Sequence, residues 1–547
     1  MKCIFTPLFL LLILFSMVSC NEKKEVDLIV SNATVYTIDS NFTKSESFAV
    51  ADGKIVETGT NEEIQKKYRS NNRIDATGKF IYPGFNDAHC HFNGYGINLM
   101  QYADLRGTES KEEIYSILKK HHAKYGGDWI LGRSWDQNDW AEKSFPDKTE
   151  LDKLFPDVPV CLVRVDGHAV WCNSKALEIG NVTGKTKVSG GDILLKNGEP
   201  TGVLIDNAEG LITHHIPDIS REQHKKGLLE AQKNCFAAGL TSVTDCGLGK
   251  NTILLMDEMQ KEGALKMRIN AMLSATEENF DHFVKKGKYK TERLNVNTIK
   301  LFSDGALGSR GALLFEDYSD DPGNRGLQIA SQDYYDKICK MAYDNNYAVA
   351  THCIGDSANR LMLNTYGKIL KGKNDRRWRI EHSQVINGDD FSKFAKFSIV
   401  PSVQATHCTS DMYWAEERLG PERIKGAYSY QTLLKQLGWL PNGTDFPVEN
   451  IEPLFTFYAA VFRADHKGWP VGGWRPEEGL TREQTLRSMT IWAAKASFDE
   501  NEKGSLEPGK WADFVILDTD LMTASPKEVL DTKIISTWSA GEKVYGL

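Results

Sequence analysis

Short apolar runs alternate with helix-length segments through most of the chain. Seven β-branched runs are predicted strands, at 239–245, 267–273, 297–302, 347–351, 378–381, 397–403 and 440–443, and an earlier run at Phe80–Phe92 makes eight. Eight strands alternating with helices are typical of an α/β fold of the (β/α)8, TIM-barrel type. We therefore expect the first barrel strand within 81–104 and the rest of the barrel over 221–504.

The two ends of the chain have a different pattern. Alternating β-type runs occur at 27–38 and 47–59, around an Asp52-Gly53 turn, and again at 509–517 and 534–545. Neither end is long enough to build a core alone, so the sequence predicts one small β-sandwich made from residues 20–80 and 505–547. Residues 105–220 are irregular, and we interpret them as an insertion after the first barrel strand, lying over the barrel mouth.

Residues 1–19 have the pattern of a secretory signal peptide, with Lys2 ahead of an apolar stretch too short to span a membrane. Met17-Val-Ser-Cys20 resembles a bacterial lipobox, in which the cysteine becomes the lipidated first residue. We expect a bacterial cell-envelope protein anchored to a membrane by lipid at Cys20. Secretion after cleavage nearby is the alternative.

Composition excludes one class of partner. The 547 residues are 41% hydrophobic and 26% charged, with a net charge of -8 and no run of Lys or Arg. A nucleic-acid partner is therefore not expected, whereas a small-molecule substrate and a second copy of the chain are candidate partners. The ten cysteines show neither a disulfide framework nor a CxxC zinc motif.

Residues able to bind a metal stand where the predicted strands end. His89 and His91 are two apart, so they project from the same face of a strand. The later strands carry the other candidates, Lys300, His352, His382 and Asp445. Barrels build their sites at these strand ends, and zinc prefers histidine nitrogen together with carboxylate oxygen. The set predicts one or two divalent cations, with zinc the first candidate. Taken singly, each residue could have a structural role.

Six further motifs stand along the chain, at Pro83–His91, Asp166–Ser174, Lys300–Ala312, His352–Asp356, Glu381–Ser383 and Gly504–Asp513. Together they resemble the amidohydrolase superfamily, specifically its family 3, which includes N-substituted formamide deformylase-like enzymes. Two departures from the family pattern lie near the predicted site. Ala405 follows Gln404 where the family usually has proline, and Thr444-Asp-Phe-Pro447 places Phe446 where a small residue is commoner. We expect Phe446 to reshape the pocket.

The resemblance implies a ligand for each metal position. His89, His91 and Asp445 would hold one cation and His352 and His382 a second. Lys300 would bridge them, and because an ammonium cannot bind a cation it must be carboxylated, or else neutral and outside the ligand set. Asp445 would also move the proton during catalysis. A one-metal site stays open.

The implied activity is hydrolysis of a non-peptide C–N bond of amide or formamide type. Cyclic amide or ester hydrolysis is the alternative within this chemistry, and a lipid-anchored binding protein without catalysis is the alternative outside it. An apolar pocket lined by His407, Trp414 and Trp474 is also expected. The candidate substrate-binding residues, each of which could instead be a structural hydrogen bonder, are His168, Trp171, Asn173, Asp304, Arg310 and Gln404.

Overall fold

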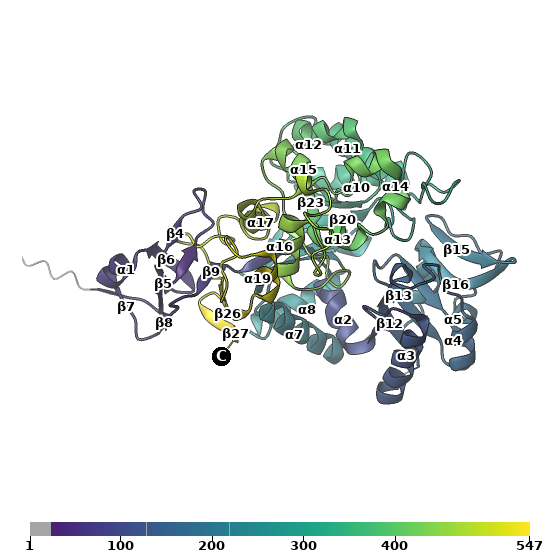
Figure 1. The fold of residues 1–547 in the computed structure, drawn as a ribbon, viewed down its shortest axis with the longest axis horizontal. Coiled ribbons are helices and arrows are strands. Elements are labelled where there is room, and N and C mark those ends of the chain that lie inside the picture. Colours follow the sequence, from purple (N-terminus) through teal and green to yellow (C-terminus); the bar gives the residue numbers. More distant parts are fainter. Residues whose placement is uncertain (1–22, 127, 218, 547) are drawn as a thin grey trace, which may run out of the picture.

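The computed structural model describes residues 23–126, 128–217 and 219–546. The predicted signal peptide and the predicted lipidation site Cys20 lie outside the described residues. Figure 1 shows a β-structure from the N-terminal part at one end, a central α/β body, and the region between residues 103 and 213 at the other end. Within the described ranges, no helix combines the length and the hydrophobicity needed to cross a bilayer.

Eight parallel strands form the barrel, and every hydrogen-bonded neighbour pair among them runs in the same direction. A ninth short strand of the same sheet, β19 (Tyr289–Lys290), pairs antiparallel with β20 at the edge of the barrel. Two backbone hydrogen bonds join the segment after the last barrel strand to the end of the first. They run from Asp445 N to the His89 carbonyl and from His91 N to the Phe446 carbonyl, and each is 2.8 Å long. The barrel is therefore nearly closed, which confirms the TIM-type prediction. Its strands are β10 (Phe85–Cys90), β17 (Leu240–Leu248), β18 (Arg268–Ser274), β20 (Leu294–Phe302), β21 (Ala348–Cys353), β22 (Arg379–His382), β23 (Val400–Gln404) and β24 (Asn442–Gly443).

Helices follow the strands, as the alternating pattern predicts. Helix α7 (Arg221–Ala237) comes before the second barrel strand, and a capping box made by Thr481 and Gln484 begins α17 (Arg482–Ser488). Among the other helices of this body are α2 (Phe92–Gln101), α8 (Lys250–Lys261), α9 (Glu277–His282), α10 (Gln332–Asp344), α11 (Asp356–Leu370), α12 (Phe391–Phe397), α13 (Ala405–Asp411), α14 (Ala415–Arg423), α15 (Tyr430–Leu437), α16 (Pro453–Phe462), α18 (Ile491–Ala496) and α19 (Pro526–Asp531).

The apolar run at Phe80–Phe92 is two strands, not the single strand expected. β9 (Phe80–Pro83) pairs with a terminal sheet, and only β10 enters the barrel. Gly84 lies between them, where a Cβ atom would come within 2.3 Å of Thr241 Oγ1. The chain therefore passes from one sheet to the other at a point where only glycine fits, a constraint that the hydrophobic pattern does not reveal.

The terminal strands form two sheets around a shared apolar core that includes Phe48, Ile81, Phe514 and Trp538. The six-stranded sheet takes strands from both ends of the chain. Asp52 and Gly53 have φ of 51° and 70°, as a tight hairpin turn requires. The sheets are β27-β26-β25-β9-β3-β4 (Glu542–Gly546, Ile534–Ser539, Phe514–Leu517, Phe80–Pro83, Thr34–Tyr36, Lys44–Ser45) and β6-β5-β2-β8 (Lys54–Gly59, Ser47–Ala51, Leu28–Ser31, Arg73–Asp75).

The segment between the first and second barrel strands has its own six-stranded sheet. Successive side chains of its strands fall into two separate apolar clusters, one on each face of the sheet. Trp135 and Trp171 belong to one cluster, and Cys161 and Leu204 belong to the other. In Figure 1 this sheet stands beside the barrel, away from the terminal sheets. Its strands are, in order, β11 (Ala103–Asp104), β12 (Ile130–Trp135), β13 (Val160–Arg164), β14 (Ala169–Cys172), β16 (Glu199–Asp206) and β15 (Gly191–Lys196), with helices α3 (Lys111–Tyr125), α4 (Thr149–Leu154), α5 (Ser174–Ile179) and α6 (Gly210–Thr213).

Candidate metal centre

The six predicted metal ligands all line one cavity of about 610 Å³ at the strand ends. His89 is the last residue but one of β10 and His91 directly follows the strand, while Asp445 stands two residues after β24. The remaining three lie within β20, β21 and β22, namely Lys300, His352 and His382. Residues spread over more than half of the chain therefore meet at the rim of the barrel, as expected for strands that run in parallel.

His89, His91 and Asp445 form the tightest cluster. His89 Nε2 lies 3.6 Å and His91 Nε2 3.4 Å from Asp445 Oδ1. Ligand atoms around one tetrahedral zinc ion lie about 3.4 Å apart, because each bond is about 2.0–2.1 Å long. Asp445 Oδ1 is buried and has no hydrogen-bond partner among the described residues. A cation would satisfy this oxygen, so the donor set fits a divalent metal.

A second cluster uses the other oxygen of Asp445. His407 Nε2 lies 3.3 Å and His382 Nδ1 4.0 Å from Asp445 Oδ2, and the three could hold a metal. His407 lies in none of the motifs that carry the family resemblance, and the sequence predicted it only as a lining residue of an apolar pocket. Its position on α13, three residues after the seventh strand, is the signal that could have found it, since the other candidate ligands lie in or just after a barrel strand.

His352 and Lys300 are less directly engaged. The His352 ring packs 4.5 Å from the ring of His382, but its Nε2 faces the Gly305 carbonyl oxygen at 3.4 Å. Lys300 Nζ lies 3.3 Å from His89 Nε2 and is almost fully buried. Both side chains face the cavity, while the bridging role of Lys300 stays a prediction.

Glu381 fixes the orientation of His89. Its Oε2 lies 2.6 Å from His89 Nδ1, and its Oε1 lies 2.9 Å from Arg379 Nε, with all three side chains buried. Burial and the charge of Lys300 lower the pKa of His89 to about 4, so the ring is neutral. The hydrogen bond places the proton on Nδ1 and leaves the Nε2 lone pair for the metal. Sequence reasoning quoted Glu381 in a motif without assigning this role.

Asp87 joins the first and last barrel strands beneath this cluster. Its carboxylate accepts hydrogen bonds from the backbone nitrogens of His89 and Thr444 and from Thr444 Oγ1, the last at 2.6 Å. Phe446 does not reshape the pocket as expected. It is fully buried and packs edge-on against Tyr95, with ring centroids 5.4 Å apart.

Of the six candidate substrate-binding residues, only His168 lines the cavity. Its Nδ1 lies 2.7 Å from Asp206 Oδ1, and its ring lies 5.0 Å from that of His352. Burial by itself lowers the pKa of His168, but the hydrogen bond with Asp206 outweighs this and raises it to about 9. The region after β10 therefore does reach the metal centre, through this histidine.

The other five candidates lie outside the cavity lining. Trp171 is fully buried in the core of the added sheet, and Asn173 caps α5 through its side-chain oxygen. Asp304 accepts three backbone N–H groups, which ties the loops after β20 and β21 together. Arg310 pairs with Asp320, and Gln404 is buried at the end of β23. Their motif positions reflect roles in packing and capping rather than contact with the cavity.

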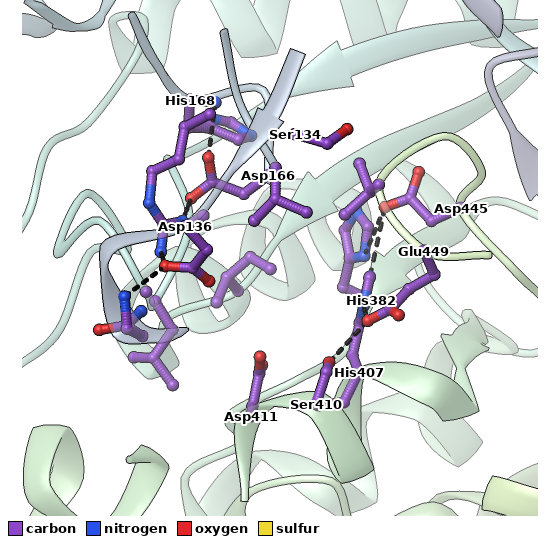
Figure 2. A pocket seen from close by; sticks show the side chains of 18 of the residues that line it. Ser134, Asp136, Asp166, His168, His382, His407, Ser410, Asp411, Asp445 and Glu449 are labelled. Carbon is purple, nitrogen blue, oxygen red and sulfur yellow. Dashed lines mark hydrogen bonds and ion pairs between the residues drawn. The ribbon is translucent and has the colours of Figure 1, made fainter. Parts of the chain in front are cut away.

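The cavity walls are polar, contrary to the apolar pocket expected. Figure 2 shows Asp136, Asp166 and His168 on one wall and His407, Ser410 and Glu449 on the other. Glu449 Oε1 accepts hydrogen bonds from Ser410 Oγ at 2.6 Å and interacts with His407 Nδ1 at 3.1 Å. Trp414 lines the cavity, whereas Trp474 packs against Tyr428, outside the lining. Sequence reasoning did not identify these charged walls.

The barrel, the two clusters of candidate ligands and the unpaired Asp445 Oδ1 are together typical of one class of protein, the metal-dependent hydrolases. The family model described as "Amidohydrolase family" matches residues 73–545, and the chain belongs to this family. It is 34% identical to "Protein LONG AFTER FAR-RED 3" of Arabidopsis thaliana, over 95% of this chain and 91% of that protein. It is 24% identical to an "N-substituted formamide deformylase" of Arthrobacter pascens, over 95% of this chain and 98% of that protein.

One solved structure is similar over almost the whole chain. An uncharacterized metal-dependent hydrolase from Pyrococcus horikoshii OT3 superimposes with a TM-score of 0.74 and 28% identity, covering 91% of this chain and 99% of that one. The family assignment, the barrel and the metal-dependent hydrolase class thus agree, and the predicted resemblance to the amidohydrolases is confirmed at this level.

Proposed function

We propose that the protein hydrolyses a non-peptide C–N bond of amide or formamide type, with one or two divalent cations, zinc first among them. The observation that carries this proposal is the convergence of His89, His91 and Asp445 around the unpaired Asp445 Oδ1. The similarity to a protein named for deformylation of N-substituted formamides supports the choice of bond.

The residues that would hold each cation follow from the distances. His89, His91 and Asp445 would hold the first, and His382 with His407 or His352 the second. Lys300 would join them only as its carbamate, because its free ammonium repels a cation. A bound divalent cation lowers the pKa of water and polarises a carbonyl group.

Asp445 is the proposed acid–base group. Burial raises its pKa, but nearby His89, the hydrogen bond with His407 and nearby His91 outweigh this and hold it well below its ordinary value, so the side chain is a carboxylate. As a carboxylate it can accept the proton of the attacking water and deliver it to the departing nitrogen. Amide cleavage needs this delivery because an amide anion is a very poor leaving group.

The test compares purified wild type with Asp445→Asn after loading with zinc in bicarbonate. We expect about one or two metal ions per chain and hydrolysis of N-(2-phenylethyl)formamide or its acetamide analogue. Asp445→Asn should lower kcat by at least about a hundredfold, the usual contribution of a positioned proton-transfer group.

The same assay separates the alternatives. Turnover restricted to dihydrouracil or phenyl acetate would favour a cyclic amide or ester hydrolase. Metal bound without turnover of any of these compounds would favour the binding protein, and failure to bind metal would contradict the enzyme assignment. In Lys300→Ala, metal content equal to wild type would contradict the bridging role.

We also propose that the protein is lipid-anchored through Cys20 in a bacterial envelope, and that a second copy of the chain is a candidate partner. The lipobox-like sequence is the support for the anchor. Expression with radiolabelled palmitate should label wild type but not Cys20→Ala. Equal labelling would exclude Cys20 as the site, and gel filtration with light scattering of the detergent-free mature chain measures the oligomeric state.

A further inference from the structure

Ser134 lies on β12 with a backbone conformation that favours glycine. Its φ is 75°, inside a strand whose other residues are extended. A side chain in this region costs of order 1 kcal/mol or more, and such residues persist where their surroundings hold them in place. Local strand propensity therefore does not explain why serine occupies this position.

A β-bulge produces this conformation. Arg133 and Trp135 of β12 pair with two consecutive residues of the neighbouring strand β13, Val163 and Arg164. Ser134 is therefore an extra residue on β12 without a partner in β13. A bulge changes the direction in which a side chain points, and bulges are frequent beside active sites. Here the bulge directs Ser134 into the cavity that holds the metal ligands.

The Ser134 side chain is largely covered and lines the cavity, and its hydroxyl has no partner among the described residues of the protein. The residue is only 5% exposed, and no hydrogen bond to its Oγ occurs within the described part of the chain. Figure 2 shows Ser134 beside His168, facing the wall that carries Asp445. A hydroxyl that lines a cavity and has no partner in the protein can hydrogen-bond a molecule bound there.

Neighbouring polar groups contrast with this serine. His168 is paired with Asp206, and Arg164 is paired with both Asp136 and Asp166, so their interactions are made within the protein. Trp135, the next residue, donates from Nε1 to the Leu162 carbonyl oxygen. Ser134 differs from all of these in that its hydroxyl is available to a molecule in the cavity.

We propose that Ser134 is a substrate-binding residue whose hydroxyl hydrogen-bonds the N–H or C=O of the amide being cleaved. A hydroxyl can donate and accept, so it suits either group of an amide. This contact would orient the amide relative to the metal ligands. The inference rests on the proposed function, because an amide must enter this cavity for the contact to form.

The test uses zinc-loaded Ser134→Ala and Ser134→Gly. Both lose the hydroxyl, and we expect the KM for N-(2-phenylethyl)formamide to rise about fivefold in each, with kcat within about twofold of wild type. Ser134→Gly should have the higher Tm of the two, because glycine adopts a φ of 75° without strain. A purely structural role would change Tm without this common rise in KM.

Ser398→Gly is the matched control, because Ser398 also has a positive φ, 49°, and lies outside the cavity lining. Its KM should equal that of wild type. The binding of benzohydroxamate to zinc-loaded protein gives a second readout that needs no turnover, and its Kd should also rise about fivefold in both Ser134 variants.

These readouts separate the two proposals. If wild type hydrolyses no compound of the panel, the proposed function fails, while the benzohydroxamate Kd still tests Ser134. Unchanged Kd in both variants would overturn the role of Ser134, as would unchanged KM when turnover is present. Failure of benzohydroxamate to bind wild type would overturn it as well.

Discussion

His89 shows how one buried hydrogen bond can prepare a candidate metal ligand. Glu381 accepts from Nδ1, and Arg379 holds the opposite oxygen of Glu381 in place. Burial raises the pKa of Glu381, but Arg379 and His89 lower it to about 2, so Glu381 is charged at neutral pH. The charge strengthens the bond to His89 and raises the basicity of Nε2.

Glu381→Gln should therefore weaken metal binding about ten- to hundredfold, as loss of a hydrogen-bond partner to a ligating histidine does. Competition with a fluorescent zinc chelator measures this affinity. Glu416→Gln, on the outer helix α14, is the control and should bind zinc as wild type does. Equal affinity in both variants would show that Glu381 does not support the metal site.

Ligand residues and substrate-contact residues differ in how well the sequence predicts them. His89, His91, His352, His382 and Asp445 were recognisable because a metal demands particular side chains at strand ends, and all five line the cavity. His407 was missed as a ligand because it lies on a helix. Trp171 and Asn173 were placed at the mouth from their motif, but the direction of each side chain depends on the packing around it.

Among the elements, the first barrel strand depends on a single glycine. β9 and β10 belong to different sheets, and Gly84 is where the chain crosses between them, against the side chain of Thr241. The hydrophobic run 80–92 predicted one continuous strand because apolar residues continue through the crossing. The crossing is set by the close approach of Thr241 on the neighbouring strand β17, and the hydrophobic pattern of the sequence carries no information about that approach.

Gly84→Ala should destabilise the protein by about 2 kcal/mol, because an added Cβ 2.3 Å from Thr241 Oγ1 forces the strands apart. Urea unfolding followed by tryptophan fluorescence measures the change. Gly372→Ala is the matched control, since a Cβ there meets no atom within 4 Å. A loss in Gly84→Ala no larger than in this control would mean that the strands relax at no cost.

At the scale of the whole molecule, a buried ion pair joins the barrel to the six-stranded terminal sheet. Arg268 on β18 donates from Nε to Asp513 Oδ2 at 2.7 Å, and both side chains are almost fully buried. Asp513 also accepts from the Ala540 backbone nitrogen, so it connects three segments of the chain. This contact is one of those that hold the chain ends against the barrel, together with the hydrogen bond from Thr537 Oγ1 to the Phe236 carbonyl oxygen.

Asp513→Ala should destabilise the protein by about 3–5 kcal/mol, because it leaves the Arg268 charge buried without its partner. Denaturant unfolding measures the loss. Asp531→Ala removes an exposed pair with Lys527 and should change the free energy of unfolding by less than about 0.5 kcal/mol. Similar effects in the two variants would show that the buried pair does not join the domains energetically.

Metal binding should stabilise the folded state as a whole. Zinc at about 100 times its Kd should raise the free energy of unfolding of metal-stripped protein by about 2.7 kcal/mol per ion, because the unfolded chain lacks the assembled site. Thermal unfolding with and without zinc measures this. His89→Ala with His91→Ala should lose most of the shift, and an unchanged shift would place the ion elsewhere.

The sequence by itself determined the barrel and most of the candidate metal ligands. Strand and helix periods are local, and parallel strands necessarily bring the residues at their ends to one rim. Only the tertiary structure decided which cavity residues remain without partners. The Glu381–His89 contact, His407 beside Asp445, and the direction of Ser134 depend on strands, helices and a bulge brought together from distant segments, and side-chain direction in such places follows from packing that no single segment encodes.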